Sequence, residues 1–67
     1  MRLRLGDHFE TDKGSFVVTG IQFKQGERVG VLIKPYRVEN DPHYQASFVK
    51  DELFEKNEYK YKGNKIL

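Results

Sequence analysis

The stretch that decides the fold is residues 15–36, SFVVTGIQFKQGERVGVLIKPY. Its two halves, 15–24 and 28–36, are rich in the β-branched and aromatic residues that suit a pleated, half-buried surface. The polar segment between them contains Gly26, which can adopt the positive φ of a tight connection. The stretch therefore predicts a β-hairpin at the centre of the chain.

The alternation of strand side chains between two faces sets the register that we expect for this hairpin. Pairing Ile21 with Val31 makes one face almost wholly apolar, whereas a slip by one residue would place Ile21 opposite Gly30. The same register gives two further pairs, Phe23 with Val29 and Thr19 with Ile33. It also places Lys24 opposite Arg28, a like-charge pair that costs a little stability and implies a wide turn of about five residues.

The other face of the hairpin is mixed, and two interpretations of it stay open. In the first, the strand 15–24 bends at Gly20, so that each half buries a different face, as small barrels do with a glycine or a bulge. In the second, that face is an exposed apolar patch that marks a site for a protein partner. The residues of this predicted protein-interaction site are Phe16, Val18, Leu32 and Tyr36.

The segments before the hairpin predict an arm and a further strand. Residues 1–5 alternate arginine with leucine, which indicates a short strand or an extended arm whose leucines point inward. Residues 8–11 follow as a strand, and the sequence TDKG at its end predicts a three-residue loop with Gly14 in the left-handed region. This loop sets Phe9 opposite Val17. The predicted core face is therefore Phe9, Val17, Ile21, Phe23, Val29, Val31 and Ile33.

The second half of the chain predicts two more strands around a short helical turn. The sequence NDP at residues 40–42 is a strong turn signal. Residues 43–49 follow as a fourth strand, with Phe48 expected in the core. Asp51 can cap a short helical turn, and residues 58–62 predict a fifth strand.

Length and composition limit the class of protein. A chain of 67 residues forms one small domain, residues 1–67. It has no cysteine, so neither a disulfide framework nor a thiolate zinc site is expected, and it suits a reducing, cytoplasmic setting. No segment approaches the roughly 20 apolar residues of a membrane span, so no membrane association is expected. The net charge of +2 and the pI near 9.0 permit a nucleic-acid partner without requiring one.

In the order of its predicted elements, the chain resembles the SH3-like small barrels, among them the Tudor and KOW domains. The residues that carry the resemblance are Gly6-Asp7-x-Phe9 before the first strand, Gly14 and Gly20 around the second, and Asp51-Glu52-Leu53 before the last. The resemblance implies an all-β fold, a single five-stranded SH3-like barrel with a short helical turn before the last strand. The chain departs from Tudor domains in having no aromatic residue in the 24–28 loop. It departs from peptide-binding SH3 domains in having neither tryptophan nor an acidic loop cluster.

The histidines are the first candidates for catalysis or metal binding. Asp7, Glu10 and Asp12 lie near His8 in the sequence, and the other histidine is His43. Their spacing fits no ligand motif, and aspartate in a turn usually bonds to the backbone. The chain also has no Gly-x-Ser-x-Gly elbow and no P-loop. We therefore expect no catalytic site, no metal and no cofactor.

Aromatic and basic residues alternate in the second half of the chain. Small barrels bind single strands by stacking bases on exposed aromatic rings while lysine and arginine hold the phosphates. The sequence predicts such a nucleic-acid-binding set, Lys34, Tyr36, Arg37, Tyr44 and Lys50. The Tyr–Lys alternation at residues 59–62 is better explained by rim tyrosines and by lysines that protect an edge strand. For Tyr36 and Arg37 the structural and the nucleic-acid interpretations both stay open. The sequence thus predicts a non-catalytic binding module, with nucleic acid as the favoured partner and the protein-interaction site as the alternative.

Overall fold

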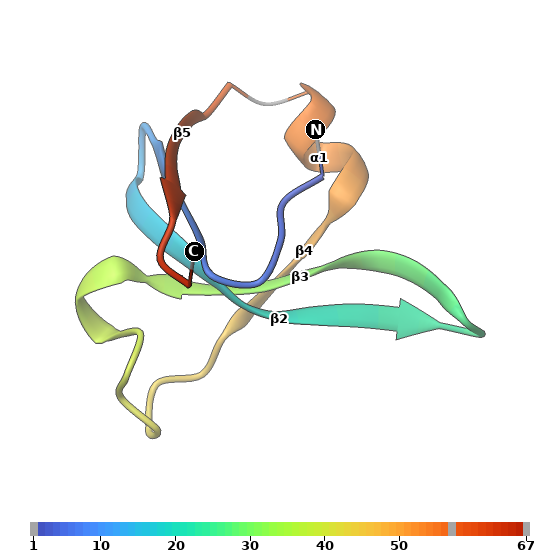
Figure 1. The fold of residues 1–67 in the computed structure, drawn as a ribbon, viewed down its shortest axis with the longest axis horizontal. Helices are drawn as coiled ribbons and strands as arrows, with labels where there is room; N and C mark the ends of the chain where they lie inside the picture. The colour runs from blue at the N-terminus through green and yellow to red at the C-terminus, as the bar shows by residue number, and fades with distance from the viewer. Residues whose placement is uncertain (1, 57, 67) are drawn as a thin grey trace.

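The computed structural model describes residues 2–56 and 58–66, which form one antiparallel sheet with two short helices (Figure 1). The strands are β1 (Asp7–Thr11), β2 (Gly14–Lys24), β3 (Glu27–Pro35), β4 (Ser47–Lys50) and β5 (Lys60–Asn64). The 3-10 helix η1 (Tyr36–Val38) follows β3, and α1 (Asp51–Lys56) lies between β4 and β5. The order across the sheet is β4-β3-β2-β1-β5. The predicted all-β fold, with five strands and a short helix before the last, is confirmed.

The sheet is curled but not closed, so the predicted barrel closure is wrong. β4 and β5 are the two edges of the sheet, and within the described residues each pairs with one neighbour, β3 and β1 respectively. β4 has four residues and runs directly into α1. The first residue of α1, Asp51, accepts two hydrogen bonds from the Arg28 guanidinium, at 2.7 and 2.9 Å. The contact with Arg28 of β3 therefore holds the start of α1, where the chain leaves the sheet. β4 ends there without pairing with β5.

A bulge in β2 explains how both ends of this strand reach the core. Val18 is buried and Ile21 packs against the same core cluster, although residues three apart should lie on opposite faces of a regular strand. The ladder with β3 shifts register between Val18 and Gly20, which leaves Thr19 as the extra residue. The predicted change of buried face near Gly20 is confirmed. The expected pairing of Thr19 with Ile33 is wrong, because Val18 takes that place.

The turn between β2 and β3 is tight rather than wide. Ile21 pairs with Val31 as predicted, but a second register shift follows between Gln22 and Phe23. Lys24 therefore pairs with Glu27, and Gln25 and Gly26 form a two-residue turn with φ of 53° and 81°. An opposite-charge pair replaces the expected like-charge pair of Lys24 with Arg28, which favours this register. Phe23 lies opposite Arg28 and not opposite Val29.

The core is smaller than the predicted one and includes the N-terminal arm. Its buried cluster is Leu3, Phe9, Val18 and Val31, with Ile21, Ile33, Phe54 and Tyr59 among the residues packed against it. Leu3 points inward as expected, whereas Leu5 is exposed. The β1–β2 turn is one residue shorter than predicted, so Phe9 pairs with Phe16 and not with Val17. Phe23 and Phe48, both predicted to be core residues, are exposed.

One buried carboxylate ties the arm, β1 and β5 together. Asp7 Oδ2 accepts a hydrogen bond from the Arg4 backbone N–H at 2.6 Å. Its Oδ1 accepts hydrogen bonds from the Tyr61 hydroxyl at 3.0 Å and from Asn64 Nδ2 at 2.7 Å. Burial of a charged group is tolerated because these donors replace water.

Neither helix of the described part of the chain has the length and apolarity needed to cross a membrane.

Candidate binding surface

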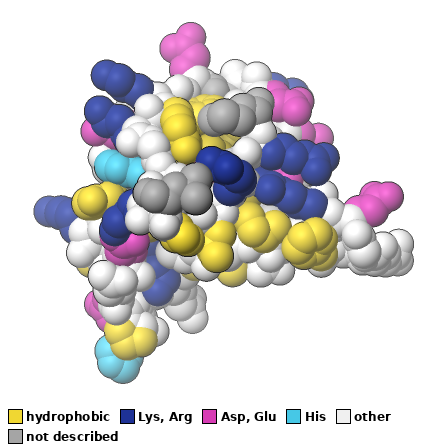
Figure 2. All heavy atoms as spheres, in the orientation of Figure 1, with side chains coloured by type: hydrophobic (Ala, Val, Ile, Leu, Met, Phe, Trp, Pro, Cys, Tyr) yellow, Lys and Arg dark blue, Asp and Glu magenta, His cyan; other side chains and the backbone are white. Residues whose placement is uncertain are grey.

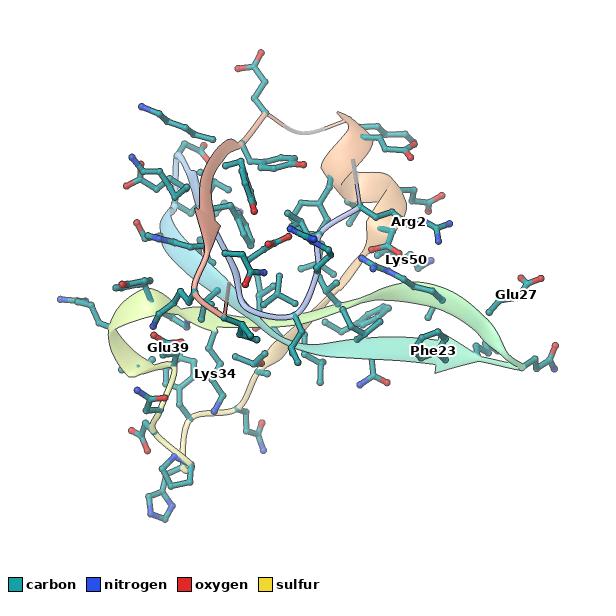
Figure 3. The ribbon with its side chains drawn as sticks, viewed as in Figure 1. Arg2, Phe23, Glu27, Lys34, Glu39 and Lys50 are labelled. Atoms are coloured by element: carbon teal, nitrogen blue, oxygen red, sulfur yellow. The ribbon has the colours of Figure 1, made fainter. Side chains whose placement is uncertain are left out.

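The predicted nucleic-acid-binding residues do not form one surface. Lys34, Tyr36, Arg37 and Tyr44 lie on or around η1 and the loop that follows it. Lys50 is at the other end of the β3–β4 pair, where it lies opposite Gly30. Gly30 is four residues from Lys34, a separation of about 13 Å along a strand. Figure 3 shows Lys34 and Lys50 in different parts of the molecule.

We call Lys34, Tyr36, Arg37 and Tyr44 the η1 group. Two of them, Tyr36 and Lys34, contact other residues of the protein. Tyr36 stacks on His8, with ring centroids 4.2 Å apart, and Lys65 Nζ lies 4.7 Å from the centroid of the Tyr36 ring. Lys65 also forms an ion pair with Glu39, so these contacts join the C-terminal segment to η1. Lys34 Nζ donates a hydrogen bond to the Asp41 carbonyl at 3.0 Å. Both side chains therefore have a structural role at η1.

The predicted protein-interaction residues are also distributed over different faces. Val18 is buried, and Phe16 packs against the core with its ring centroid 5.8 Å from that of Phe9. Leu32 follows the buried Val31 and so lies on the opposite face of the sheet. Tyr36 lies beyond the end of β3. The bulge at Thr19 is the reason, because it turns Val18 into the core while Leu32 stays outside.

An apolar hollow on the face opposite the core was not expected from the sequence. It has a volume of about 490 Å³ and is lined by Gln22, Phe23, Lys24, Val29, Leu32 and Phe48. We call these six residues the Phe23–Phe48 surface. Phe23 is 63% exposed and Phe48 is 47% exposed, although both belong to strands. Two exposed phenylalanine side chains therefore line the same hollow, which makes it a candidate binding surface.

The positions of both phenylalanines follow from the two strand registers. Phe48 precedes Val49, which packs against the core, so alternation places Phe48 on the opposite face, where it pairs with Leu32. Its ring covers Gly30, since a Cβ atom there would lie 2.7 Å from Phe48 Cε1. Phe23 lies opposite Arg28 near the hairpin tip, because the register shift after Gln22 leaves Val29 as the extra residue of β3. The signal for this shift was the two-residue turn, which pairs Lys24 with Glu27.

Cationic side chains border the Phe23–Phe48 surface. Lys24 lines the hollow, and Lys50 is two residues from Phe48 on the same side of β4. In the view of Figure 3, the labels of Arg2 and Lys50 are adjacent, and Phe23 is on the same side of the molecule. In Figure 2, dark blue side chains border yellow ones in this region. Glu27 is at the tip of the β2–β3 hairpin, and its side chain points away from the hairpin in Figure 3. Lys24 also pairs with Glu27 across the turn, so the border of the surface carries both signs of charge, with Lys50 as a second basic side chain.

A second hollow opens on the core side of the sheet, between its two unpaired edges. It has a volume of about 1080 Å³, and its apolar lining includes Phe16, Ile33, Val49, Leu53, Phe54 and Tyr59. Its charged lining residues are Glu10, Asp12, Lys13, Glu58 and Lys60. We call this hollow the open-edge groove. It exists because the sheet does not close, so that the apolar residues at this end of the core stay partly exposed.

Glu10, on the rim of the open-edge groove, is held in its ionised form. The Ser15 hydroxyl donates a hydrogen bond to Glu10 Oε2 at 3.1 Å, and Lys62 Nζ lies 3.3 Å from Oε1. Ser15 first and Lys62 second lower the pKa of Glu10 below its ordinary value of 4.5. Because the pKa is lowered in the folded state, this contribution to stability is present above pH 4.5 and is lost as the pH falls through the folded pKa.

This pKa gives a prediction for titration. In a carbon-13 NMR pH titration, the Glu10 carboxyl is expected to titrate below 4.5, and Ser15→Ala is expected to raise its pKa. Ser47→Ala, at an exposed serine on β4, should leave the Glu10 pKa unchanged. A Glu10 pKa at or above 4.5 in the unmodified protein would contradict the two contacts.

The histidines considered as metal or acid–base residues have different surroundings. His8 stacks on Tyr36, and the His43 backbone N–H donates a hydrogen bond to Asp41 Oδ1 at 2.9 Å in an exposed loop. In the described ranges, 2–56 and 58–66, no group of three or more His, Asp or Glu side chains could hold a metal ion. Neither histidine belongs to the lining of the two hollows.

Comparisons with known proteins identify no relative of this chain: no family model, no curated protein and no solved structure matches it. Its function is therefore inferred from its own surfaces and charges.

Proposed function

We propose that this protein is a non-catalytic, SH3-like binding module of the cytoplasm that takes single-stranded nucleic acid on the Phe23–Phe48 surface. The observation that carries the proposal is the pair of exposed phenylalanine rings that share one hollow with Lys24. The strand order β4-β3-β2-β1-β5, with a short helix before the last strand, supports the SH3-like assignment. The absence of cysteine supports a reducing compartment.

Stacking is the interaction that exposed phenylalanine rings offer to a nucleic acid. Each base that stacks on an aromatic ring contributes about 1–3 kcal/mol, and every base has a face that can stack. Phe23 and Phe48 can each take one base, with Leu32 between them as an apolar floor. Lys24 and Lys50 then lie where phosphates of the same strand pass. The surface therefore suits a short single strand of any sequence.

A single strand fits this surface better than a duplex does. The faces of paired bases are covered by their neighbours in a duplex, so that they are not free to stack on protein rings. Insertion of an α-helix into the major groove is one way to read a duplex. The α-helix of the described chain has six residues and packs beside β3 and β4.

A protein partner on the same surface is the second candidate. Val29 and Leu32 make the floor of the hollow apolar, and apolar patches bordered by charge are typical of protein interfaces. The two candidates differ in their dependence on salt. Binding to a single strand weakens as salt rises, with a log–log slope of about −0.7 per phosphate contact, whereas contact of apolar surfaces does not weaken in this way.

The proposal predicts which aromatic residues matter for affinity. In anisotropy titrations with a fluorescein-labelled mixed-sequence 12-mer of RNA or DNA, Phe23→Ala and Phe48→Ala should each weaken binding about 5-fold to 150-fold. Tyr44→Ala is the matched control, because Tyr44 is 43% exposed and lies outside the surface. Lys24→Gln and Lys50→Gln should each make the salt slope shallower by about 0.7.

Three outcomes would count against single-strand binding at this surface. Equal affinity for Phe23→Ala and the unmodified protein would remove the site. A loss confined to Tyr44→Ala would move it to the η1 group. If neither the RNA nor the DNA 12-mer binds saturably at low salt, the protein-partner candidate is left. The same two phenylalanine variants then serve as its controls. A thermal melt of each variant separates loss of binding from loss of fold.

A further inference from the structure

We infer that the open-edge groove is a second binding site, which takes an extended peptide segment of a partner protein as an added strand beside β4. The inference goes beyond the proposed nucleic-acid function and concerns another face of the molecule. It depends on three features of the described residues: a free strand edge, an apolar groove next to it, and a rim of mixed charge.

The first feature is the edge of β4. β4 pairs with β3 through Gly30–Lys50, Val31–Val49, Leu32–Phe48 and Ile33–Ser47, and it is the last strand on this side of the sheet. In an antiparallel ladder, alternate residues direct their backbone N–H and C=O groups to one neighbour and the others to the opposite side. Half of the backbone groups of β4 therefore face away from β3 and can pair with another strand.

The two edges of the sheet differ in how they are protected. β5 carries the exposed lysines Lys60 and Lys62, side chains that oppose pairing with another chain. β4 has the sequence SFVK, with its one charge at the end where α1 begins. An incoming strand therefore meets less electrostatic and steric opposition at β4 than at β5.

The second feature is the groove beside β4. Ser47 and Val49 line it, so a strand added at β4 would direct alternate side chains into the same hollow. The floor contains Phe16 and Ile33, and α1 contributes Leu53 as one wall. Apolar side chains at alternate positions of the peptide would cover these partly exposed residues. This pattern of backbone pairing with pockets for alternate side chains is that of strand addition.

The third feature, the charge of the rim, selects a peptide over the other possible occupants. The groove is lined by three acidic residues and two lysines, which opposes a polyanion such as nucleic acid. A second copy of the chain, paired through β4, would use an edge of four residues. A stable interface needs roughly 20–30 residues a side, so this edge is too short to hold a dimer. A peptide meets the same short edge, but its alternate side chains would also fill the apolar groove beside β4.

The test begins with a phage-displayed library of random decapeptides, selected on the immobilised full chain. An enriched peptide is synthesised with a fluorescent label and titrated by anisotropy. Leu53→Glu, which places a charge in the groove wall, is expected to weaken binding at least about tenfold. Leu5→Glu is the matched control, because Leu5 is 48% and Leu53 is 41% exposed, and Leu5 does not line the groove. Ser47→Lys is a second variant of the groove, should Leu53→Glu fail to fold.

The position of the peptide is read from backbone amides. Bound peptide should shift the amide signals of residues 47–50 and slow hydrogen exchange at alternate positions of β4. Phe23→Ala should leave peptide affinity unchanged, so that failure of this site and failure of the nucleic-acid site are separate results. The inference is overturned if no peptide is enriched. It is also overturned if enriched peptides bind the Leu53→Glu and Ser47→Lys variants as tightly as the unmodified chain. Protection of the β4 amides with rising protein concentration alone would indicate a second copy at this edge and would overturn it too.

Discussion

Replacement of Asp7 by alanine is expected to lower the free energy of unfolding by about 3–5 kcal/mol. The carboxylate is buried and accepts hydrogen bonds from the Arg4 N–H, the Tyr61 hydroxyl and Asn64 Nδ2. Alanine removes the acceptor of the Arg4 N–H and of the Tyr61 hydroxyl, and a donor left unsatisfied costs about 1–3 kcal/mol. Asn64 Nδ2 keeps the Leu5 carbonyl as an acceptor. A domain of this size has a total stability of roughly 3–10 kcal/mol, so the variant should lose a large part of it.

Urea denaturation with an unchanged m value measures this effect. Asp12→Ala is the matched control, because Asp12 is an exposed aspartate in the adjacent β1–β2 turn. Its effect should stay within about 0.5 kcal/mol. The loss of unfolding free energy in Asp7→Asn should lie between those of Asp7→Ala and Asp12→Ala. The amide oxygen of asparagine still accepts a hydrogen bond, whereas its NH₂ group faces the Arg4 N–H. An Asp7→Ala variant as stable as Asp12→Ala would show that this carboxylate does not hold the arm and β5 together.

Replacement of Gly30 by alanine is expected to lower the free energy of unfolding by about 2–3 kcal/mol and to detach β4 from β3. A Cβ atom at this position would lie 2.4 Å from the Val49 carbonyl oxygen and 2.7 Å from Phe48 Cε1. The Phe48 ring can rotate away, but the carbonyl is backbone and moves only with β4 itself. Because Phe48 would be displaced, the variant should also lose affinity at the Phe23–Phe48 surface.

Gly20→Ala is the matched control for this substitution. Gly20 lies opposite Leu32 on the neighbouring strand, and its added Cβ atom would lie 3.2 Å from Leu32 Cδ1, the end of a flexible side chain. Its cost should be below about 1 kcal/mol. Amide signals of residues 47–50 report whether β4 is still paired. Equal stabilities of the two alanine variants would contradict the close approach of β3 and β4 at Gly30.

The sequence predicted nucleic-acid binding from residue types that lie close together in the chain, and our proposal assigns it to a different surface. Lys50 is the one member of the predicted set beside the Phe23–Phe48 surface. Tyr36 had the right chemistry, but its ring contacts His8 and Lys65, which lie at the two ends of the described chain. Phe23 was assigned to the core because the pairing of β2 with β3 was extended past Gln22 without a shift. Phe48 was assigned to the core because the wrong face of β4 was chosen, since Val49 is the residue that packs there. Their exposure is the main change that the structure makes to the candidate site.

The sequence by itself determined the central hairpin, the pairing of Ile21 with Val31 and the short helix before the last strand, and it offered the change of buried face near Gly20 as one of two interpretations. These features depend on local composition, turn residues and period-two patterns, which act between neighbours in the chain. Only the tertiary structure decided the register shift at Thr19 and the open edge of β4, whereas the shift after Gln22 had a local signal in the two-residue turn. A shift of one residue exchanges the faces of a strand, and it is set by the balance of distant contacts, such as Arg28 with Asp51 and Gly30 with Phe48, that no local pattern contains.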